Sequence, residues 1–376
     1  MDRTIQPPVI ADLARKMVFV GGPRQVGKTT LALNILGGDE RHPAYLDWDN
    51  VENKQQISAG HLPANQPLIV FDELHKYREW RNLLKGLYDK RKGITSFLVT
   101  GSARLDLYRK GGDSLQGRYL YYRLHPFSLY ELNRHPSKED LLNLLRFGGF
   151  PEPFLVGSER EWRRWQQGYR SRITREELID LRAVREVSQL ELLVSMLRER
   201  AGSLLSVNAL REDLKVSHET ASRWLLILED LYYCFCIHPW MGNLTRSLKK
   251  ERKLYLWDWS AVTAEGAGFE NLVASNLLKY CHFLEDTEGL PMQLRFLRDR
   301  QGHELDFVVM EGETPRFAVE CKRKPQDPIR SFSYFLKRTE IPLFYQVHME
   351  EDDYELPDRR IRVIPFIRFC AEVLRI

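Results

Sequence analysis

The chain has 376 residues, of which 43% are hydrophobic and 29% charged, and its formal net charge is +4 at pH 7. This composition is typical of a globular protein whose length allows two or three domains with cores of their own. No apolar run reaches the roughly 20 residues of a membrane span, and the N-terminus lacks a signal-peptide core, so we expect a cytoplasmic protein without a membrane partner. The slight positive charge permits a nucleic-acid partner without requiring one.

The cysteines give no sign of a metal site. None of the five forms a CxxC pair or lies in a His-rich segment. Free thiols in a reducing compartment are the simplest interpretation.

The most specific motif lies near the N-terminus, where an apolar strand at 17–20 runs into GGPRQVGKTT and then into a helical pattern. This is the GxxxxGK[ST] phosphate-binding loop in its strand–loop–helix setting. Backbone N–H groups of such a loop surround phosphate oxygens at a helix N-terminus. Lys28 would reach the β- and γ-phosphates, and the Thr29 hydroxyl would bind Mg²⁺. We therefore expect ATP to contact Gly22, Pro23, Arg24, Gln25, Val26, Gly27, Lys28, Thr29 and Thr30.

A second motif supports this assignment, because the apolar strand in PLIVFDELHK ends in Asp72 and Glu73. Asp72 fits the carboxylate that holds Mg²⁺ through water, and Glu73 fits the base that polarises the attacking water. An acidic strand end without a catalytic role is the alternative, which the preceding phosphate loop disfavours.

Three further strands are expected at 44–50, 96–102 and 119–124, with helical connections between the strands. This alternation predicts an α/β domain with a parallel sheet. In ATPases whose catalytic Glu follows the Mg²⁺-binding Asp, the strand ending in Thr-Gly-Ser lies between the other two. That position would place Thr100 or Ser102 beside the γ-phosphate, although a simple strand-end turn is also compatible with this pair.

Arg118 follows in the glycine-rich segment GGDSLQGRYL. If the protein forms a homo-oligomer, this side chain could complete the ATP site of a neighbouring copy as an arginine finger. The alternative is an ordinary surface arginine.

A Gly/Pro-rich joint, FGGFPEPFLVG, precedes two helical patterns in EREWRRWQQGYRSRITREEL and QLELLVSMLRERAG. We assign residues 136–200 to a helical lid or linker. The mixture of Arg, Trp and Tyr could stack on nucleic acid, but an amphipathic helix with Arg stems along its apolar side is the default interpretation.

Residues 201–262 read as helix, short turn, helix and strand, which indicates a winged helix. Ser217 fits the N-cap of the second helix, whose buried stripe would be Leu225, Leu228 and Leu231. The exposed N-terminal part would then be a DNA recognition helix that presents His218, Thr220, Ser222 and Arg223. A basic wing would contact phosphates through Arg246, Lys249, Lys250, Arg252 and Lys253. A winged helix used only for packing or protein contact is the alternative.

The segment HELDFVVMEGETPRFAVECKRK is expected to form two strands joined by a turn. Alternation of side chains places Glu304 and Asp306 on one face of the first strand, opposite Leu305, Phe307 and Val309. In the second strand Glu320 and Lys322 share a face. Either the charged faces are solvated, or they hold a metal.

A helical pattern upstream, GFENLVASNLLKY, carries Glu270 on its apolar stripe. A carboxylate there is costly unless it is paired or bound to a metal. The order Glu270, Asp306, Glu320-x-Lys322 resembles the layout of restriction-endonuclease-like enzymes. Asp306 and Glu320 would bind Mg²⁺ or Mn²⁺, with Glu270 as a further ligand or base. The metal would activate water and Lys322 would stabilise the transition state. The alternative is an inherited fold without cleavage, since charged residues are common on edge strands.

The motifs GGPRQVGKTT, LIVFDELHK, LVTGSARL, SLQGRYLYYRLHPFSLYEL, FGGFPEP and HELDFVV…FAVECK together resemble a known family. It comprises bacterial and archaeal single-chain AAA-type ATPases that end in a domain of unknown function with a restriction-endonuclease-like core. The resemblance covers nearly the whole chain. It implies that Arg118 matches the family's SLxGR arginine, which favours the finger interpretation. The sensor segment departs from the usual small polar residues, so Arg104 is a second candidate for contacting nucleotide.

We therefore expect a P-loop AAA-type domain at 1–135, a helical lid at 136–200, a winged helix at 201–262 and a restriction-endonuclease-like α/β domain at 263–376. The predicted function is Mg²⁺-dependent ATP hydrolysis coupled to DNA binding, with metal-dependent DNA cleavage as an open addition. One alternative is a nucleotide-switched DNA- or protein-binding regulator with an inactive nuclease-like domain. Another is an ATPase that acts on a protein partner and ignores nucleic acid.

Overall fold

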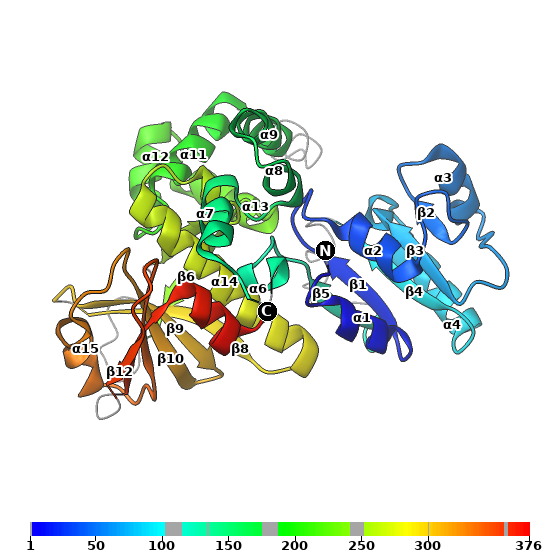
Figure 1. Cartoon of the computed structure of the whole chain (residues 1–376). Helices are drawn as coiled ribbons and strands as arrows, with labels where there is room; N and C mark the ends of the chain where they lie inside the picture. Colours follow the sequence, from blue (N-terminus) through cyan, green and yellow to red (C-terminus); the bar gives the residue numbers. More distant parts are fainter. Residues whose placement is uncertain are drawn as a thin grey trace. The chain divides into compact units, whose positions relative to one another are not determined.

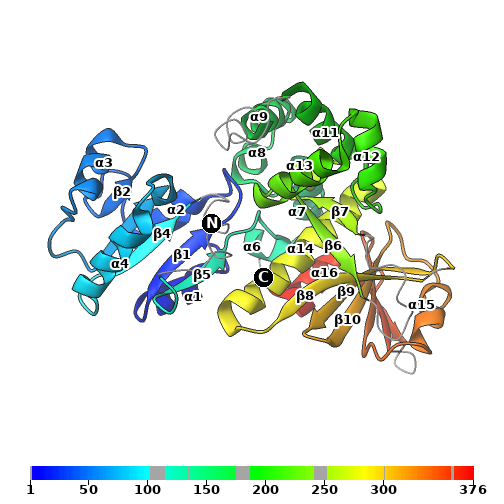
Figure 2. The same cartoon turned by 180° about the vertical axis from the view of Figure 1, so that it is seen from behind.

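The structure, a computed structural model, describes residues 2–101, 115–133, 135–174, 187–240, 252–299, 301–356 and 360–376. The chain divides into two compact units, which are labelled by element in Figures 1 and 2. The first consists of Met1–His125 with the short segments Asp230–Tyr232 and Asp286–Glu288. The second contains the remainder, and its further division at residues 200 and 262 stays a prediction.

The first unit is built on a parallel five-stranded sheet, as the sequence predicted. Its strands have the order β2-β3-β4-β1-β5, and all four pairings are parallel. Strand β4 lies between β3 and β1, which is the expected position for the strand that ends in Thr100. The strands are β1 (Met17–Gly21), β2 (Tyr45–Asp47), β3 (Leu68–Asp72), β4 (Ser96–Thr100) and β5 (Tyr119–Arg123).

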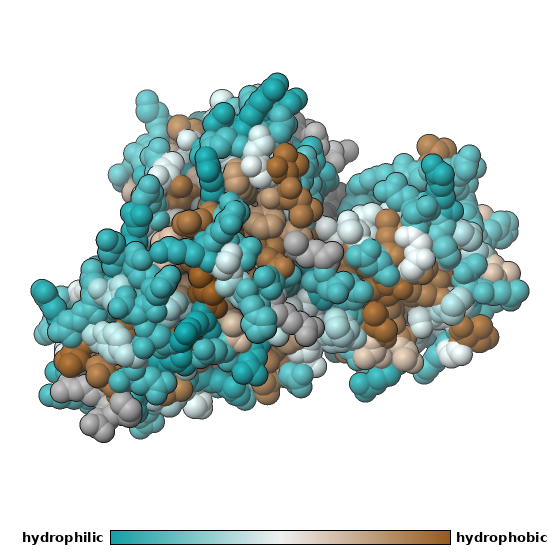
Figure 3. All heavy atoms as spheres, viewed as in Figure 1, coloured by the Kyte–Doolittle hydropathy of each residue, from teal (hydrophilic) through white to brown (hydrophobic). Residues whose placement is uncertain are grey.

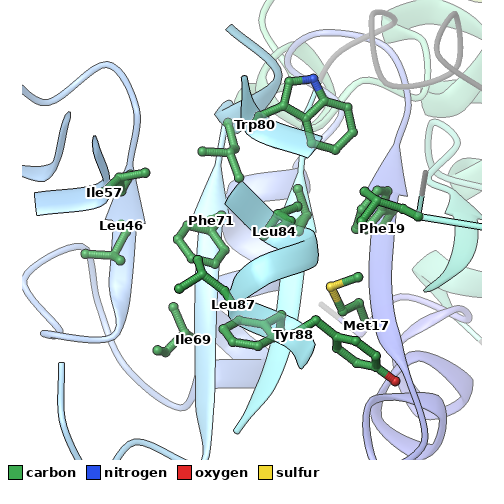
Figure 4. Close-up of a cluster of buried hydrophobic side chains, with 14 of the residues drawn as sticks. Met17, Phe19, Leu46, Ile57, Ile69, Phe71, Trp80, Leu84, Leu87 and Tyr88 are labelled. Carbon is green, nitrogen blue, oxygen red and sulfur yellow. The ribbon is translucent and has the colours of Figure 1, made fainter. Parts of the chain in front are cut away.

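Helices cover both faces of this sheet, which explains why its strands are almost continuously apolar. Figure 4 shows Met17 and Phe19 of β1 in one buried cluster with Phe71 of β3 and with Leu84 and Tyr88 of a helix. The intervening side chains of β1 point to the opposite face, against which two other helices pack. The helices are α1 (Gln6–Leu13), α2 (Lys28–Leu36), α3 (Val51–Ser58) and α4 (Trp80–Arg91), with the short 3₁₀ helix η1 (Leu74–Lys76).

The second unit begins with helices whose aromatic residues are buried. Trp165 stacks on Tyr169 with ring centroids 4.8 Å apart, and both contact Phe150. The neighbouring Arg160 and Arg164 are exposed, so this helix is amphipathic, as the default interpretation expected. The helices are α6 (Leu129–Leu132), α7 (Lys138–Phe147), α8 (Pro151–Val156), α9 (Glu159–Arg172) and α11 (Val187–Glu199).

The segment from 203 to 261 contains two helices followed by a hairpin. Helix α12 (Val207–Leu214) and helix α13 (His218–Asp230) precede the antiparallel strands β6 (Cys234–Pro239) and β7 (Lys253–Leu256), and the 3₁₀ helix η5 (Trp259–Ala261) follows. Leu204 forms an antiparallel bridge with Lys253. Ser217 caps α13, because its hydroxyl accepts the backbone N–H of Thr220 at 3.0 Å.

The C-terminal part extends this hairpin into an eight-stranded sheet of order β12-β13-β11-β10-β9-β8-β6-β7. The long helix α14 (Glu265–Glu288) precedes three antiparallel strands, and helix α15 (Pro328–Leu336) makes the crossover from β10 to the parallel strand β11. The remaining elements are β8 (Met292–Arg298), β9 (Glu304–Glu311), β10 (Thr314–Cys321), β11 (Phe344–His348), β12 (Tyr354–Leu356), β13 (Ile361–Pro365), α16 (Phe366–Phe369) and the π-helical turn η7 (Cys370–Leu374).

The two faces of this second sheet pack against different helices. Phe332 and Phe335 of α15 share a buried cluster with Ala318 of β10. On the other face Phe317 of β10 contacts Tyr280 of α14, with ring centroids 6.2 Å apart. This division decides below which charged side chains can meet.

The predicted alternation along β9 is interrupted by a bulge. Leu305 and Val308 pack in the same cluster as α15, because three residues of β9 oppose two residues of β8 at this point. Phe307 instead contacts Tyr255 of β7, with ring centroids 5.6 Å apart. The expectation that Leu305, Phe307 and Val309 share one face was therefore wrong.

The molecular face drawn in Figure 3 is mostly hydrophilic, with smaller hydrophobic areas between the polar ones. None of the helices in the described ranges is both long and apolar enough to cross a membrane.

Candidate functional site

The phosphate loop joins β1 to α2 in a backbone conformation that few residues tolerate. Gly22 has a φ of 150°, and a Cβ atom there would lie 2.4 Å from the carbonyl oxygen of Leu124. Gly27 has a φ of 97° at the N-cap of α2, and Gln25 also has a positive φ of 61°. Successive residues of opposite backbone handedness turn their N–H groups toward one point, which is the geometry of an anion-binding nest. The loop therefore has a backbone geometry that suits phosphate binding, and the contact of residues 22–30 with ATP stays a prediction.

Lys28 is buried beneath this loop. Its Nζ donates hydrogen bonds to the carbonyl oxygens of Pro23 at 2.7 Å and Gly22 at 3.1 Å, and only 6% of the residue is exposed. These contacts hold the ammonium at the loop. From there it can exchange its carbonyl partners for phosphate oxygens with only a small movement.

Asp72 collects hydroxyl groups from three elements. Its carboxylate accepts hydrogen bonds from Thr29 at 2.6 Å and from Tyr45 at 2.7 Å, and a third from Thr100. A hydroxyl beside a carboxylate is the donor set that Mg²⁺ takes in P-loop proteins. Thr29 and Asp72 therefore fit the predicted ion.

Glu73 lies beside this group in a strained backbone position, with a φ of 53°. Its backbone N–H donates to the carbonyl oxygen of Thr100 at 3.0 Å, which fixes it between β3 and β4. Burial raises the pKa of the Glu73 carboxyl, while the charges of Lys28 and Lys76 partly offset that effect. A carboxylate with a raised pKa next to the phosphate loop is suited to accept a proton.

Thr100 is fully buried and its hydroxyl is directed to Asp72. Its hydroxyl therefore contacts the carboxylate predicted to hold Mg²⁺, and its contact with the γ-phosphate stays a prediction. The other candidates from this strand end, Ser102 and Arg104, lie outside the described residues.

Arg118 and the phosphate loop lie at opposite ends of the strands in this sheet. It precedes β5, whose first residue pairs with Met17, whereas the loop follows the other end of β1. A strand of five residues is about 16 Å long. The Arg118 guanidinium binds Asp89 of α4, with Nε–Oδ1 at 3.0 Å and Nη2–Oδ2 at 3.3 Å. Arg118 therefore does not reach the nucleotide site of its own chain, and the action in trans stays a prediction.

A second group of charges lies in the C-terminal part, around the ammonium of Lys253. The Nζ atom is 3.4 Å from Glu270 Oε1 and 3.7 Å from Asp306 Oδ1, and it also contacts Glu304. Lys253 is 3% exposed. Burial acts to lower its pKa, but the charges of Asp306, Glu270 and Glu304 outweigh burial and raise it. Burial and the charge of Asp306 raise the pKa of Glu270 to about 7.

Glu320 and Lys322 form a separate pair, with 2.8 Å between Glu320 Oε1 and Lys322 Nζ. Strand alternation puts Glu320 on the same face of β10 as Ala318, toward α15. Glu270 belongs to α14, which packs on the other face. Asp306, Glu320 and Glu270 thus do not converge, and no group of three His, Cys, Asp or Glu side chains suited to a metal exists among the described residues.

Two of the basic residues expected to contact DNA phosphates have other partners. The buried Lys253 is unavailable for this role, so that prediction was wrong for it. Arg252 binds Glu229 at 3.3 Å. The reason is that Lys253, on the edge strand β7, is buried against carboxylates of α14 and β9, whereas the sequence pattern suggested an exposed wing. Arg246, Lys249 and Lys250 lie outside the described residues.

Helix α13 agrees with the pattern predicted for it. Leu225, Leu228 and Leu231 are buried, while His218 and Arg223 are exposed and Thr220 and Ser222 are partly exposed.

Sequence reasoning missed Tyr45 and Tyr255, assigned Lys253 to a DNA-contacting wing, and named Glu304 without giving it a role. The Tyr255 hydroxyl donates to Glu270 at 2.8 Å, and the Tyr45 hydroxyl donates to Asp72. The Tyr45 contact joins strands β2 and β3, and the Tyr255 contact joins strand β7 to helix α14, so only the folded arrangement could have pointed to them.

Comparison with protein-family models divides the chain into three matches. Residues 14–133 match an AAA domain. Residues 138–268 match a domain of unknown function, DUF8612, and residues 265–369 match another, DUF4143. The predicted AAA-type P-loop domain and the C-terminal domain of unknown function are thereby confirmed.

Curated relatives resemble the chain over most of its length. Uncharacterized proteins of Mycobacterium bovis and Mycobacterium tuberculosis are 26% identical over 365 residues, covering 92% of this chain and 79% of theirs. An uncharacterized protein of Methanocaldococcus jannaschii is 24% identical and covers 82% of this chain and 75% of its own.

Solved structures align at lower similarity. The Aeropyrum pernix ORC1 protein in complex with DNA is 15% identical, with a TM-score of 0.35 over 73% of this chain and 94% of that chain. The Thermotoga maritima RuvB Holliday junction branch migration motor is 16% identical, with a TM-score of 0.30 over 66% and 89%.

Proposed function

We propose that the first unit hydrolyses ATP with Mg²⁺. The observation that carries this proposal is the meeting of Thr29 and Asp72 at 2.6 Å beside Lys28, at the end of a parallel sheet and under a glycine-rich loop. Residues from β3, β4 and α2 meet there, and the loop supplies the N–H groups that phosphates need.

Each side chain then has one task. Lys28 exchanges its carbonyl partners for phosphate oxygens and neutralises developing charge. Thr29 and Asp72 hold the ion, which supplies charge stabilisation to the transferring phosphoryl group. Glu73 accepts a proton from the attacking water, a role for which its raised pKa is an advantage at neutral pH. Arg118 acts on the site of a second copy, because it precedes β5 at the end of the sheet away from its own phosphate loop.

We further propose that the second unit binds duplex DNA through a winged helix. The support is the arrangement of α12, α13 and the β6–β7 hairpin, with Leu204 adding a bridge to β7. The exposed start of α13, with His218 and Arg223, is the part that enters the major groove in such folds. A helix pair used for protein contact would account for the same elements.

The geometry favours a nucleotide-switched DNA-binding regulator over a nuclease. The order α14, β8, β9, β10, α15 and β11 supports a restriction-endonuclease-like core, but the three predicted metal ligands do not converge. We place the protein in the cytoplasm, with DNA as its partner and ATP with Mg²⁺ as its cofactor.

The test measures fluorescence anisotropy of labelled duplex DNA with and without a non-hydrolysable ATP analogue. The expected result is an affinity that changes with nucleotide and weakens as salt increases. Arg223→Glu should weaken binding about tenfold or more, whereas Arg330→Glu on α15, also exposed, should change it little. Equal affinity for all variants, with ATP turnover that ignores DNA, would instead favour a protein partner.

A further inference from the structure

Lys253 occupies the centre of the acidic group in the second unit, at the place where a nuclease-like fold would hold its metal. A lysine ammonium has three N–H donors, and three carboxylates approach this one, from Glu270, Glu304 and Asp306. They come from α14 and β9, while Lys253 comes from β7. The ammonium thus links its own strand, β7, to α14 and β9.

Each carboxylate has a second partner as well. Glu270 accepts from the Tyr255 hydroxyl at 2.8 Å, and Asp306 accepts from the backbone N–H of Cys321 at 2.8 Å. Glu304 lies 3.4 Å from Arg298. Buried carboxylates are tolerated when they are paired and hydrogen-bonded in this way. The oxygens of these carboxylates are therefore satisfied by the donors of Lys253, Tyr255 and Cys321 and by Arg298, without an added ion.

The remaining predicted ligand is turned away. Glu320 lies on the α15 face of β10 and binds Lys322, whereas Glu270 approaches from the α14 face. A hard divalent cation needs about six oxygen ligands around one point. Water can complete the shell of such an ion, but the three carboxylates on the Lys253 side already share the positive charge of the ammonium, which would repel a divalent cation.

We propose that Lys253 is a built-in cation that takes the place of a divalent metal, so that this centre binds the β7 hairpin to α14 and β9 and takes up no Mg²⁺ or Mn²⁺. The centre is then structural. It makes the segment that follows α13 one body with the C-terminal sheet. This inference is independent of the proposed ATP hydrolysis in the first unit, so an experiment can refute one proposal without refuting the other.

The experiment counts bound Mn²⁺ by electron paramagnetic resonance in the nucleotide-free full chain. Wild type and Asp306→Asn should bind the same amount, because Asp306 already neutralises Lys253. Lys253→Met, which keeps much of the side-chain length but removes the charge, should take up one additional Mn²⁺ per chain. That gain should disappear in Lys253→Met/Asp306→Asn.

Thermal unfolding provides a second readout. Lys253→Met should melt at a lower temperature than wild type, since three carboxylates lose their shared cation. Mn²⁺ should raise its melting temperature by several degrees, because a ligand that binds only the native state stabilises it, and should leave wild type unchanged. Lys322→Met is the matched control and should gain no Mn²⁺.

Two results would overturn the proposal. One is Mn²⁺ binding, or Mn²⁺-dependent cleavage of plasmid DNA, that wild type shows and Asp306→Asn loses. The other is a folded Lys253→Met protein that takes up no additional Mn²⁺. If Lys253→Met does not fold, the comparison of wild type with Asp306→Asn decides alone.

Discussion

Asp72 and Glu73 are neighbours in sequence but have different surroundings. Asp72 is satisfied by hydroxyl groups from Thr29, Tyr45 and Thr100. Glu73 has cations at longer range, with Lys76 at 3.5 Å, and burial raises its pKa. These surroundings suit the predicted roles of Asp72 as ion holder and Glu73 as proton acceptor, which stay predictions. The contribution of Tyr45 was not foreseeable, because it depends on the pairing of β2 with β3.

Glu73→Gln tests the proton acceptor. An amide keeps the size of the side chain but accepts a proton poorly, so ATP hydrolysis should fall about a hundredfold or more while ATP binding is retained. Phosphate release and equilibrium binding measure the two quantities. Glu79→Gln, an exposed position nearby, should behave as wild type. Loss of binding in Glu73→Gln, or unchanged hydrolysis, would exclude this role.

The pH dependence of hydrolysis follows from the same residue. Glu73 must be ionised to accept the proton, so the rate should fall as pH decreases through its pKa. Because that pKa is raised, the acid limb of the kcat profile should lie above the usual glutamate value of about 4.3. An acid limb at or below that value would show that another group limits the reaction.

At the scale of elements, strand alternation was a good guide until the backbone departed from regular pairing. The bulge in β9 could not be inferred from HELDFVVME, since bulges are fixed by the register with the neighbouring strand. The burial of Lys253 was hidden for a similar reason. Its sequence neighbours are basic, which suggested a solvated wing, but α14 and β9 bring three carboxylates to its side chain. In contrast, α13 was predictable because helix caps and leucine spacing are local signals.

The buried carboxyl of Asp258, at the start of η5, gives a prediction about stability. Asp258 is 5% exposed, it accepts hydrogen bonds from Gln166 and Ser260, and a Cβ atom on Gly148 would lie 2.6 Å from it. Burial raises the pKa of Asp258 from 3.8 to about 6, and the hydrogen bonds from Ser260 and Gln166 offset only part of this. The native state therefore binds a proton more tightly than the unfolded chain.

The sign follows from proton linkage. A raised pKa contributes stability that is present below the unfolded pKa near 4 and is lost as pH rises through about 6. The loss is about 3 kcal/mol for a shift of this size, as an upper limit. Urea unfolding from pH 4 to pH 7 should show this decrease in wild type and in Asp39→Asn, an exposed control. Asp258→Asn should lose only the part of the decrease that Asp258 contributes, because the raised pKa values of Glu270 and Glu73 also reduce stability as pH rises. A decrease as large as that of wild type would refute the assignment.

At the scale of the molecule, the predicted functions belong to different units. The phosphate site lies in the first unit, whereas α13 and the Lys253 centre lie in the second. Arg118 is in the first unit, but it lies at the end of the strands away from the phosphate loop of its own chain. The sequence identified the order of these parts, because motif and element patterns are local. It could not identify which charged groups meet, since that requires the folded arrangement of β7, β9 and α14.

Mixing two inactive variants tests whether Arg118 acts on a second copy. Arg118→Ala keeps an intact ATP site without a finger, and Glu73→Gln keeps the finger with an inactive site. In an assembly that mixes randomly, a 1:1 combination should recover about a quarter of the wild-type hydrolysis rate. The double variant Asp89→Asn/Glu73→Gln still carries Arg118. Mixed with Arg118→Ala, it should restore hydrolysis as well as Glu73→Gln does. Absence of recovery, with both variants folded and assembled, would leave Arg118 a surface residue.

The most direct test of the account is ATP binding to the full chain with Mg²⁺, measured by isothermal titration calorimetry for wild type and Lys28→Ala. Lys28 donates hydrogen bonds to the carbonyl oxygens of Gly22 and Pro23 in the phosphate loop, and circular dichroism checks that Lys28→Ala is folded. We predict that wild type binds one ATP per chain and that Lys28→Ala binds at least about tenfold more weakly and does not hydrolyse it. Wild-type protein that neither binds nor hydrolyses ATP, or a Lys28→Ala variant with unchanged affinity and turnover, would contradict the account.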